Sequence, residues 1–110
     1  MNSNQIIIFA SGSGSNAENI VNYFSNKRSN HKWLICTNNP KARVIERAKK
    51  LNIDFKIFTK DELYNGSILN CINSLNPELI ILAGFLLKFP IEIINAVSYT
   101  HLTLPPIYSV

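Results

Sequence analysis

A glycine-rich segment near the amino terminus is the part of the sequence best suited to chemistry. Residues 11–15 read Ser-Gly-Ser-Gly-Ser and follow an apolar run. Glycines let backbone amides approach an anion, and a helix that begins directly after them adds N–H groups and a favourable dipole. Phosphate is the natural ligand of such a turn. The alternative is that the glycines only permit a tight turn, and that Ser15 or Asn16 caps the helix without touching a ligand.

The same loop fits two nucleotide-binding patterns incompletely. Gly12, Gly14 and Ala17 match the dinucleotide fingerprint G-x-G-x-x-A, which is typical of NAD sites. An NAD site also requires an acidic residue after the second strand, whereas residues 36–39 read Cys-Thr-Asn-Asn. The Walker pattern fails because no Gly-Lys-Ser/Thr follows the loop. The loop therefore predicts a phosphate-bearing ligand but names no reaction.

The strands and helices that must position this loop alternate along the chain. The apolar run 6–10 suits a strand buried on both faces of a parallel sheet, and helical spacing begins at Asn16. Three further strands are predicted, at 33–36, 55–58 and 79–83. The pattern predicts an α/β fold, a Rossmann-like open parallel sheet with helices on both faces.

Two of the predicted helices carry start signals. Asn39 is the expected N-cap of a helix with Pro40 at its first position, running to about residue 50. Thr59 and Glu62 form a capping box that opens one continuous helix, in which Gly66 costs about 1 kcal/mol relative to alanine. The side chains of that helix expected to face inward are Leu63, Ile68, Cys71, Ile72 and Leu75.

Composition limits the chain to one small domain or a piece of one. It has 110 residues, 46% of them hydrophobic, and a net charge of +4. We interpret the basic groups at 27–28, 41–47 and 49–50 as solvated faces, and expect no nucleic-acid site. Cys36 and Cys71 lie in apolar surroundings, which predicts two buried free thiols. The start of the sequence lacks a signal peptide or a membrane span, which favours a soluble cytoplasmic protein.

Several segments together resemble glycinamide ribonucleotide formyltransferase. They are residues 10–16, residues 36–39 with Ala42, and residues 77–85, which read Pro-Glu-Leu-Ile-Ile-Leu-Ala-Gly-Phe. The resemblance covers roughly residues 5–96. It implies transfer of a formyl group from 10-formyltetrahydrofolate to the amino group of glycinamide ribonucleotide, without a metal ion.

The resemblance also implies two sets of site residues. Those matching the positions that hold the phosphoribosyl substrate are Gly14, Ser15 and Asn16. Those matching the folate pocket are Leu86, Leu87, Lys88 and Phe89. Ordinary core packing is the alternative for the three apolar residues of the second set. Relatives often carry a folate-contacting basic residue near Lys60, which we expect here to be a solvated side chain beside the capping box.

The sequence departs from the family after residue 96. The family's catalytic Asn-x-His-Pro motif and later aspartate are missing, so no catalytic residue is assigned and the chain alone is expected to be inactive and poorly soluble. Residues 97–110 contain no Asp, Glu, Lys or Arg, and we interpret them as a tail foreign to the family, translated from adapter or chimeric DNA. His101 is expected to be an exposed side chain without a catalytic role.

Two other functions stay open on the sequence alone. One is another folate-dependent formyltransferase, or a formyltetrahydrofolate hydrolase, of the same fold. The other is a non-catalytic nucleotide-binding module that uses the same loop. The phosphate-binding loop favours the small ribonucleotide substrate over the first of these. The oligomeric state is left open.

Overall fold

A parallel β-sheet forms the centre of the molecule. The computed structural model describes residues 4–26, 31–90 and 107–109, and within these the sheet has five strands in the order β3-β2-β1-β4-β5. All four pairings are parallel. The strands are β1 (Gln5–Phe9), β2 (Lys32–Thr37), β3 (Asp54–Ile57), β4 (Leu79–Leu82) and β5 (Ile107–Ser109). The four strands that the sequence predicts are confirmed.

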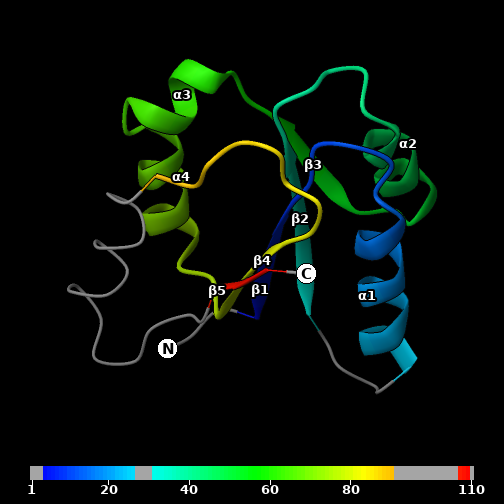
Figure 1. The fold of residues 1–110 in the computed structure, drawn as a ribbon. Coiled ribbons are helices and arrows are strands. Elements are labelled where there is room, and N and C mark those ends of the chain that lie inside the picture. Colours follow the sequence, from blue (N-terminus) through cyan, green and yellow to red (C-terminus); the bar gives the residue numbers. More distant parts are fainter. Residues whose placement is uncertain (1–3, 27–30, 91–106, 110) are drawn as a thin grey trace.

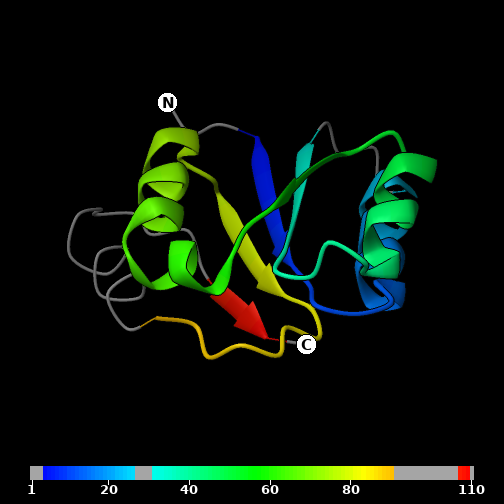
Figure 2. The same ribbon diagram turned by 90° about the horizontal axis from the view of Figure 1, so that it is seen from above.

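Helices cover both faces of this sheet. α1 (Ser15–Asn26) and α2 (Arg43–Lys50) lie on one face, and α3 (Lys60–Tyr64) and α4 (Ser67–Leu75) lie on the other (Figures 1 and 2). Each pair of helices packs on its own cluster of buried apolar residues. The predicted Rossmann-like α/β class is therefore confirmed.

The central strand β1 is buried from both sides. Ile6 and Ile8 belong to the apolar cluster beneath α1 and α2, whereas Ile7 and Phe9 belong to the cluster beneath α3 and α4. Because successive side chains of a strand point to opposite faces, a strand covered on both faces needs apolar residues at every position. Burial on both faces therefore explains why residues 6–10 form a continuous apolar run in the sequence.

The predicted start of α2 is wrong. The helix begins at Arg43, three residues later than expected, and its N-cap Ala42 is extended and offers no side-chain cap. Asn39 instead accepts a hydrogen bond on its Oδ1 from the Lys41 N–H (3.0 Å), and its carbonyl accepts one from the Ala42 N–H (3.0 Å). An Asn side chain serves a local turn as well as a helix cap, and here the turn is formed.

The helix predicted after Thr59 is divided into two. The capping box is confirmed, since Thr59 Oγ1 accepts from the Glu62 N–H (3.1 Å) and Glu62 Oε1 accepts from the Thr59 N–H (2.9 Å). The break falls at Gly66, which has a φ of 99° and ends the run of helical dihedrals between α3 and α4. A left-handed conformation costs glycine little. Of the side chains expected to face inward, three are buried and two are half-buried: Leu63, Ile68 and Ile72, then Cys71 and Leu75.

The short strand β5 was not expected. Its register pairs Ile80 with Ile107 and Leu82 with Ser109, so β4 has a neighbour on each side. Residues 91–106, which include His101 and the predicted division at residue 96, lie outside the described part of the chain. The division into residues 1–96 and 97–110 therefore stays a prediction.

Candidate functional site

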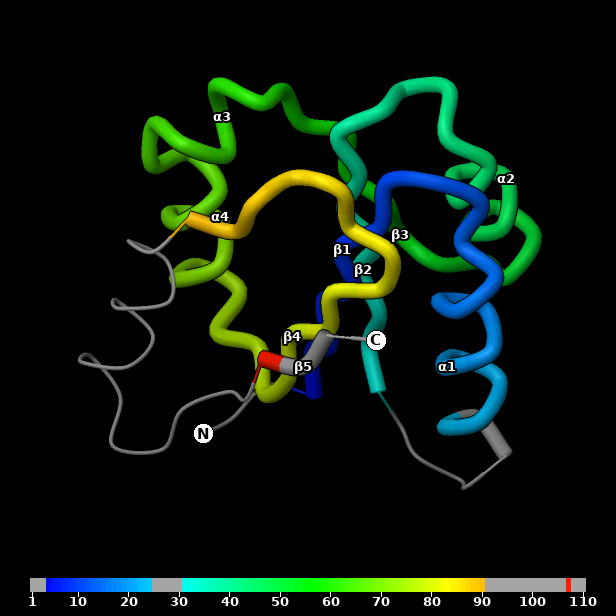
Figure 3. The backbone as a smooth tube through the Cα atoms, viewed as in Figure 1, coloured from blue at the N-terminus to red at the C-terminus, as the bar shows by residue number. Residues whose placement is uncertain are grey.

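The connections that leave β1, β2 and β4 lie at one end of the sheet. Figure 3 shows them passing over the carboxyl ends of the three strands. β1 lies between β2 and β4, and the chain leaves it through α1 on one face but reaches β4 through α4 on the other. The carboxyl ends of β1 and β4 therefore form a topological switch point, the place where ligands bind in doubly wound proteins.

The glycine loop (residues 11–15) surrounds a small hollow at this switch point. The hollow has a volume of about 230 Å³. We call it the loop hollow, and its lining residues are Gly12, Ser13, Gly14, Ser15, Asn16, Ala83 and Gly84. The three residues predicted to hold a phosphoribosyl group thus lie together. A larger hollow of about 450 Å³ lies at the opposite end of the strands, where its lining includes His31 and Trp33.

Gly14 is required by the packing of the loop on α2. Its φ is 77°, and a Cβ placed on it would lie 2.4 Å from Cγ2 and 2.9 Å from Cα of Val44. By contrast, a Cβ on Gly12 would meet nothing within 4 Å. The Gly14 carbonyl accepts the first hydrogen bond of α1, from the Glu18 N–H (2.9 Å). This glycine brings the starts of two helices together at the loop hollow.

Ser11 joins three segments of the chain at the switch point. Its hydroxyl donates to Asn38 Oδ1 after β2 (2.7 Å) and accepts from the Leu86 N–H after β4 (3.0 Å). The side chain is buried, so neither contact is readily replaced by water. Sequence reasoning treated Ser11 only as a member of the loop. Its position directly after a buried strand was the available signal, but its partners are 27 and 75 residues away.

Replacing Ser11 with alanine is expected to lower the free energy of unfolding by about 2 kcal/mol, because the Leu86 N–H and Asn38 Oδ1 lose a buried partner. Urea denaturation of the full chain measures this. Ser13→Ala is the matched control, since Ser13 is exposed and its contact with Ser15 is 3.5 Å long. The control should change stability by less than about 0.5 kcal/mol. Equal effects of the two substitutions would contradict the bridging role of Ser11.

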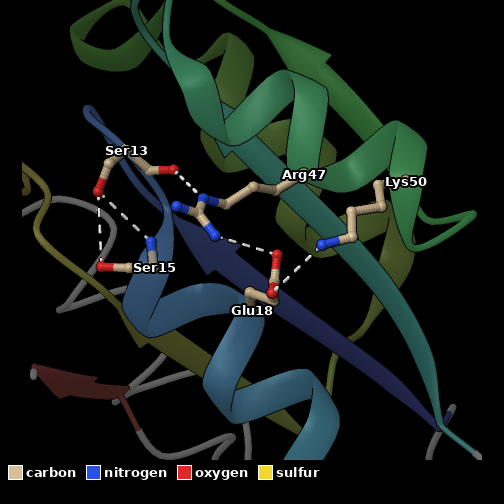
Figure 4. Close-up of polar contacts among 5 residues, drawn as sticks. All are labelled: Ser13, Ser15, Glu18, Arg47 and Lys50. Atoms are coloured by element: carbon tan, nitrogen blue, oxygen red, sulfur yellow. Dashed lines mark hydrogen bonds and ion pairs between the residues drawn. The ribbon is translucent and has the colours of Figure 1, made fainter.

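Arg47 contacts the glycine loop from α2. Its Nε donates to the Ser13 carbonyl (2.6 Å), and its Nη1 donates to Glu18 Oε1 (3.1 Å) (Figure 4). Lys50 approaches the other oxygen of the same carboxylate at 3.8 Å. The sequence interpretation placed the basic residues 41–47 on solvated faces, and the Arg47 side chain is still 33% exposed. Its side chain is held by two acceptors from other parts of the chain.

Residues 86–89, which follow β4 by three residues, do not line the loop hollow. Leu86 is 83% exposed, Leu87 is half-buried and Lys88 is exposed. Phe89 is buried and packs edge-to-face on Phe9, with ring centroids 5.1 Å apart. Core packing therefore accounts for Phe89, whereas Leu86 is open to a ligand. The assignment of these four residues to a folate pocket stays a prediction.

The position of this segment is fixed partly from α3. The Tyr64 hydroxyl donates to the carbonyl of Lys88 (2.6 Å). Lys60, at the start of the same helix, is exposed, as the sequence predicts for a solvated side chain. The hydrogen bond from the Tyr64 side chain therefore holds the backbone of Lys88 in place, while the Lys88 side chain is exposed.

The Cys36 thiol lies buried on β2, and its pKa is raised to about 12. Burial is the main cause, the nearby Cys71 adds to it, and Lys56 opposes both. The thiol of the unfolded chain ionises near pH 9.0, so its stabilising contribution is complete below that pH and is lost as pH rises towards 12. Burial of Cys36 is confirmed, whereas Cys71 is half-buried.

We expect iodoacetamide at pH 8 to alkylate Cys71 and to leave Cys36 unmodified until the chain unfolds, because only the thiolate is reactive. Mass spectrometry of tryptic peptides measures both sites. Between pH 9 and 12, the parent chain should lose about 1.4 kcal/mol of stability per pH unit relative to a Cys36→Ala variant. Equal alkylation of the two thiols in the folded chain would contradict this.

Two features of the described residues bear on ligands and membranes. Among residues 4–26, 31–90 and 107–109, no group of three or more His, Cys, Asp or Glu side chains could hold a metal ion. Within the same ranges, no helix is long and apolar enough to cross a membrane. The expectations of a reaction without metal and of no nucleic-acid partner stay predictions.

The fold and the site together define a class of protein. A doubly wound parallel sheet with a glycine loop leading into its first helix defines a Rossmann-like α/β protein. Members of this class bind their ligands at the switch point, where the loop hollow lies. The family model described as formyl transferase matches residues 4–109. The chain belongs to the formyl transferase family.

Solved structures of similar proteins agree with this placement. Glycinamide ribonucleotide transformylase 1 from Geobacillus kaustophilus is 28% identical, with a TM-score of 0.71 over 84% of this chain and 52% of its own. Phosphoribosylglycinamide formyltransferase from Bacillus halodurans is 26% identical, with a TM-score of 0.72 over 86% and 52%. The enzyme from Brucella melitensis, at 21% identity, shares the fold with a TM-score of 0.74 over 90% and 54%. The chain thus spans about half the length of these proteins.

Proposed function

We propose that this chain is the amino-terminal part of a glycinamide ribonucleotide formyltransferase. The reaction would transfer a formyl group from 10-formyltetrahydrofolate to the amino group of glycinamide ribonucleotide, in the cytoplasm. The family match over residues 4–109 supports the reaction class, and the likeness to two glycinamide ribonucleotide transformylases supports the substrate. The observation that carries the proposal is the loop hollow, which gathers Gly14, Ser15 and Asn16 at the first turn of α1.

The phosphate of the ribonucleotide is assigned to the loop hollow. None of the seven lining residues carries a charge, so no carboxylate of the lining repels an anion. The first amides of α1 have no partner within the helix and carry the positive end of its dipole. Ser15 and Asn16 are exposed and add a hydroxyl and an amide to these backbone donors. A phosphate group is the ligand that this combination suits best.

The formyl donor is assigned to the segment after β4. Leu86 and Leu87 offer apolar surface at the carboxyl end of that strand, and the backbone of Lys88 is fixed by Tyr64. An apolar site with a few fixed polar groups suits the pteridine ring of a folate. Phe89 would contribute by packing beneath the segment, because its own side chain is buried on Phe9. The proposed reaction needs no metal ion.

Chemistry at the formyl carbon is assigned to residues that this sequence lacks. The family's Asn-x-His-Pro motif and later aspartate are missing from the 110 residues. We therefore propose that the chain by itself binds ligands without turnover, and that residues 97–110 have a foreign origin, although the family match extends to residue 109 and Ile107–Ser109 pair with β4. A long DNA read across the codons for residues 94–98, free of ligated adapters, tests the second point. A confirmed genomic copy of the present tail would refute it.

Calorimetric titration of the full chain tests the proposed function. Glycinamide ribonucleotide should bind and be displaced by inorganic phosphate, and a stable folate analogue should bind independently of both. Preference for NAD with no response to folates would instead identify a nucleotide-binding module. Binding of folate without the ribonucleotide would favour another formyltransferase, or a hydrolase, of the same fold.

A pair of variants localises the ligand. Ser15→Asp places a carboxylate at the mouth of the loop hollow. This change should weaken ribonucleotide binding by about tenfold or more, because the carboxylate repels the phosphate group bound in the hollow. Asn19→Asp is the matched control, since Asn19 is exposed one turn further along α1 and undergoes the same change of charge. Equal weakening by both variants would place the phosphate elsewhere.

A further inference from the structure

The contact between Arg47 and the glycine loop connects α2 with the site. Arg47 reaches across 34 residues of sequence to donate from Nε to the Ser13 carbonyl, at 2.6 Å. Glu18 Oε1 accepts from the same guanidinium at 3.1 Å, so two acceptors hold the group in one orientation (Figure 4). The two partner side chains are 33% and 18% exposed, which places the pair partly out of water.

The carbonyl that Arg47 binds belongs to the peptide unit between Ser13 and Gly14. The described residues contain no cis peptide bond, so the Ser13 carbonyl and the Gly14 N–H point in opposite directions. The carbonyl points towards Arg47 on α2, and the N–H therefore points away from that helix. In the part of the chain that the structure describes, no protein acceptor receives the Gly14 N–H. Ser13 and Gly14 both line the loop hollow.

We propose that Arg47 is a positioning residue for the anion site. By holding the Ser13 carbonyl, its guanidinium keeps the Gly14 N–H directed to the loop hollow. A charged donor on the carbonyl also polarises the peptide unit, which makes its N–H a stronger donor to an anion. The inference rests on the proposed function, because it assumes that the loop hollow binds the phosphate group.

Glu18 gives Arg47 a second effect on the same site. Its carboxylate lies in the first turn of α1, where a negative charge competes with a bound anion for the positive end of the helix dipole. Arg47 and, at 3.8 Å, Lys50 pair with this carboxylate. Removing Arg47 therefore leaves the Glu18 charge less compensated. A double variant separates this electrostatic effect from the orientation of the peptide.

Titration of the full chain with inorganic phosphate, followed by amide NMR spectra, tests the inference. Arg47→Met keeps the apolar stem and should weaken phosphate binding by about tenfold, the size expected for one charge-assisted hydrogen bond. Arg47→Lys should recover part of the loss. Glu18→Gln with Arg47→Met should still bind weakly. Lys50→Met is the matched control, with the same loss of charge on the same helix but no contact with Ser13, and should bind within about twofold of the parent.

Residual dipolar couplings of the Gly14 N–H in the free chain provide a readout that a general loss of stability does not change. The coupling should change in Arg47→Met and stay as in the parent in Lys50→Met, while amides outside the loop keep their values in both. Unchanged coupling, or full recovery of binding in the double variant, would overturn the inference although the parent binds phosphate. Failure of the parent chain to bind phosphate or glycinamide ribonucleotide would instead overturn the proposed function, and the inference with it.

Discussion

Replacing Gly14 with alanine is expected to lower the free energy of unfolding by about 3 kcal/mol. A left-handed conformation costs an alanine about 1–2 kcal/mol, and overpacking at a tight contact adds about 1–3 kcal/mol. Here the new methyl carbon would lie 2.4 Å from Val44 Cγ2, well inside van der Waals contact. The loop or the start of α2 must move, so phosphate binding should weaken as well. Urea denaturation and phosphate titration of the same sample measure the two effects.

Two variants control this experiment. Gly12→Ala should leave stability within about 0.5 kcal/mol of the parent, because the space around that position is open. Adding Val44→Ala to Gly14→Ala should restore only part of the loss, since Val44 Cβ and Cα stay 2.7 and 2.9 Å from the added carbon. Equal tolerance of alanine at positions 12 and 14 would show that the close contact with α2 is absent.

Replacing Phe9 with alanine is expected to cost about 4 kcal/mol, since truncation of a buried phenylalanine leaves a cavity. Phe9 is fully buried, and its ring makes edge-to-face contacts with Phe58, Phe85 and Phe89 at centroid distances of 5.9, 5.5 and 5.1 Å. A small domain is stable by about 5–15 kcal/mol, so between about a quarter and four-fifths of its stability would be lost. Thermal and urea denaturation measure the change.

Phe9→Leu is the matched control for this change. Leucine keeps apolar volume at the position but loses the three ring contacts, so it should cost about 1–2 kcal/mol. Of those rings, Phe85 directly precedes the segment proposed to bind the folate and Phe89 is its last residue, so folate binding should weaken in both variants. Unchanged folate affinity in a folded Phe9→Leu chain would place that ligand away from the segment after β4.

The strands and the loop could be predicted because their signals are local. β1 is buried on both faces, so its residues Ile6–Phe9 and the following Ala10 are five apolar residues in succession. The glycine loop is likewise recognised from its own composition. The start of α2 could not be predicted in this way, because Asn39 has the same chemistry in a turn as at a helix cap. Glycine at position 66 disfavours a continuous helix by only about 1 kcal/mol, and tertiary packing readily outweighs a preference of this size. The break at Gly66 could therefore not be predicted from the sequence. The three residues of β5 gain their structure from pairing with β4.

The roles of most residues that organise the site could not be predicted from the sequence pattern. Nothing local distinguishes Arg47 from its basic neighbours in residues 41–50, yet it alone among them binds the Ser13 carbonyl in the described structure. Ser11 likewise acquires its role from Asn38 and Leu86, which the sheet brings to it. Long-range partners depend on strand order, and a single sequence does not specify strand order through local spacing.

The contacts of Ser11 also determine when the site can exist during synthesis. The glycine loop leaves the ribosome well before β4, and one partner of its first residue is Leu86, 75 residues later. At synthesis rates of about 5–20 residues per second, the loop waits several seconds for that partner. Its geometry is completed only when β4 enters the sheet beside β1. Phosphate binding to a nascent chain would therefore report assembly of the whole central sheet, although the binding residues are encoded at its beginning.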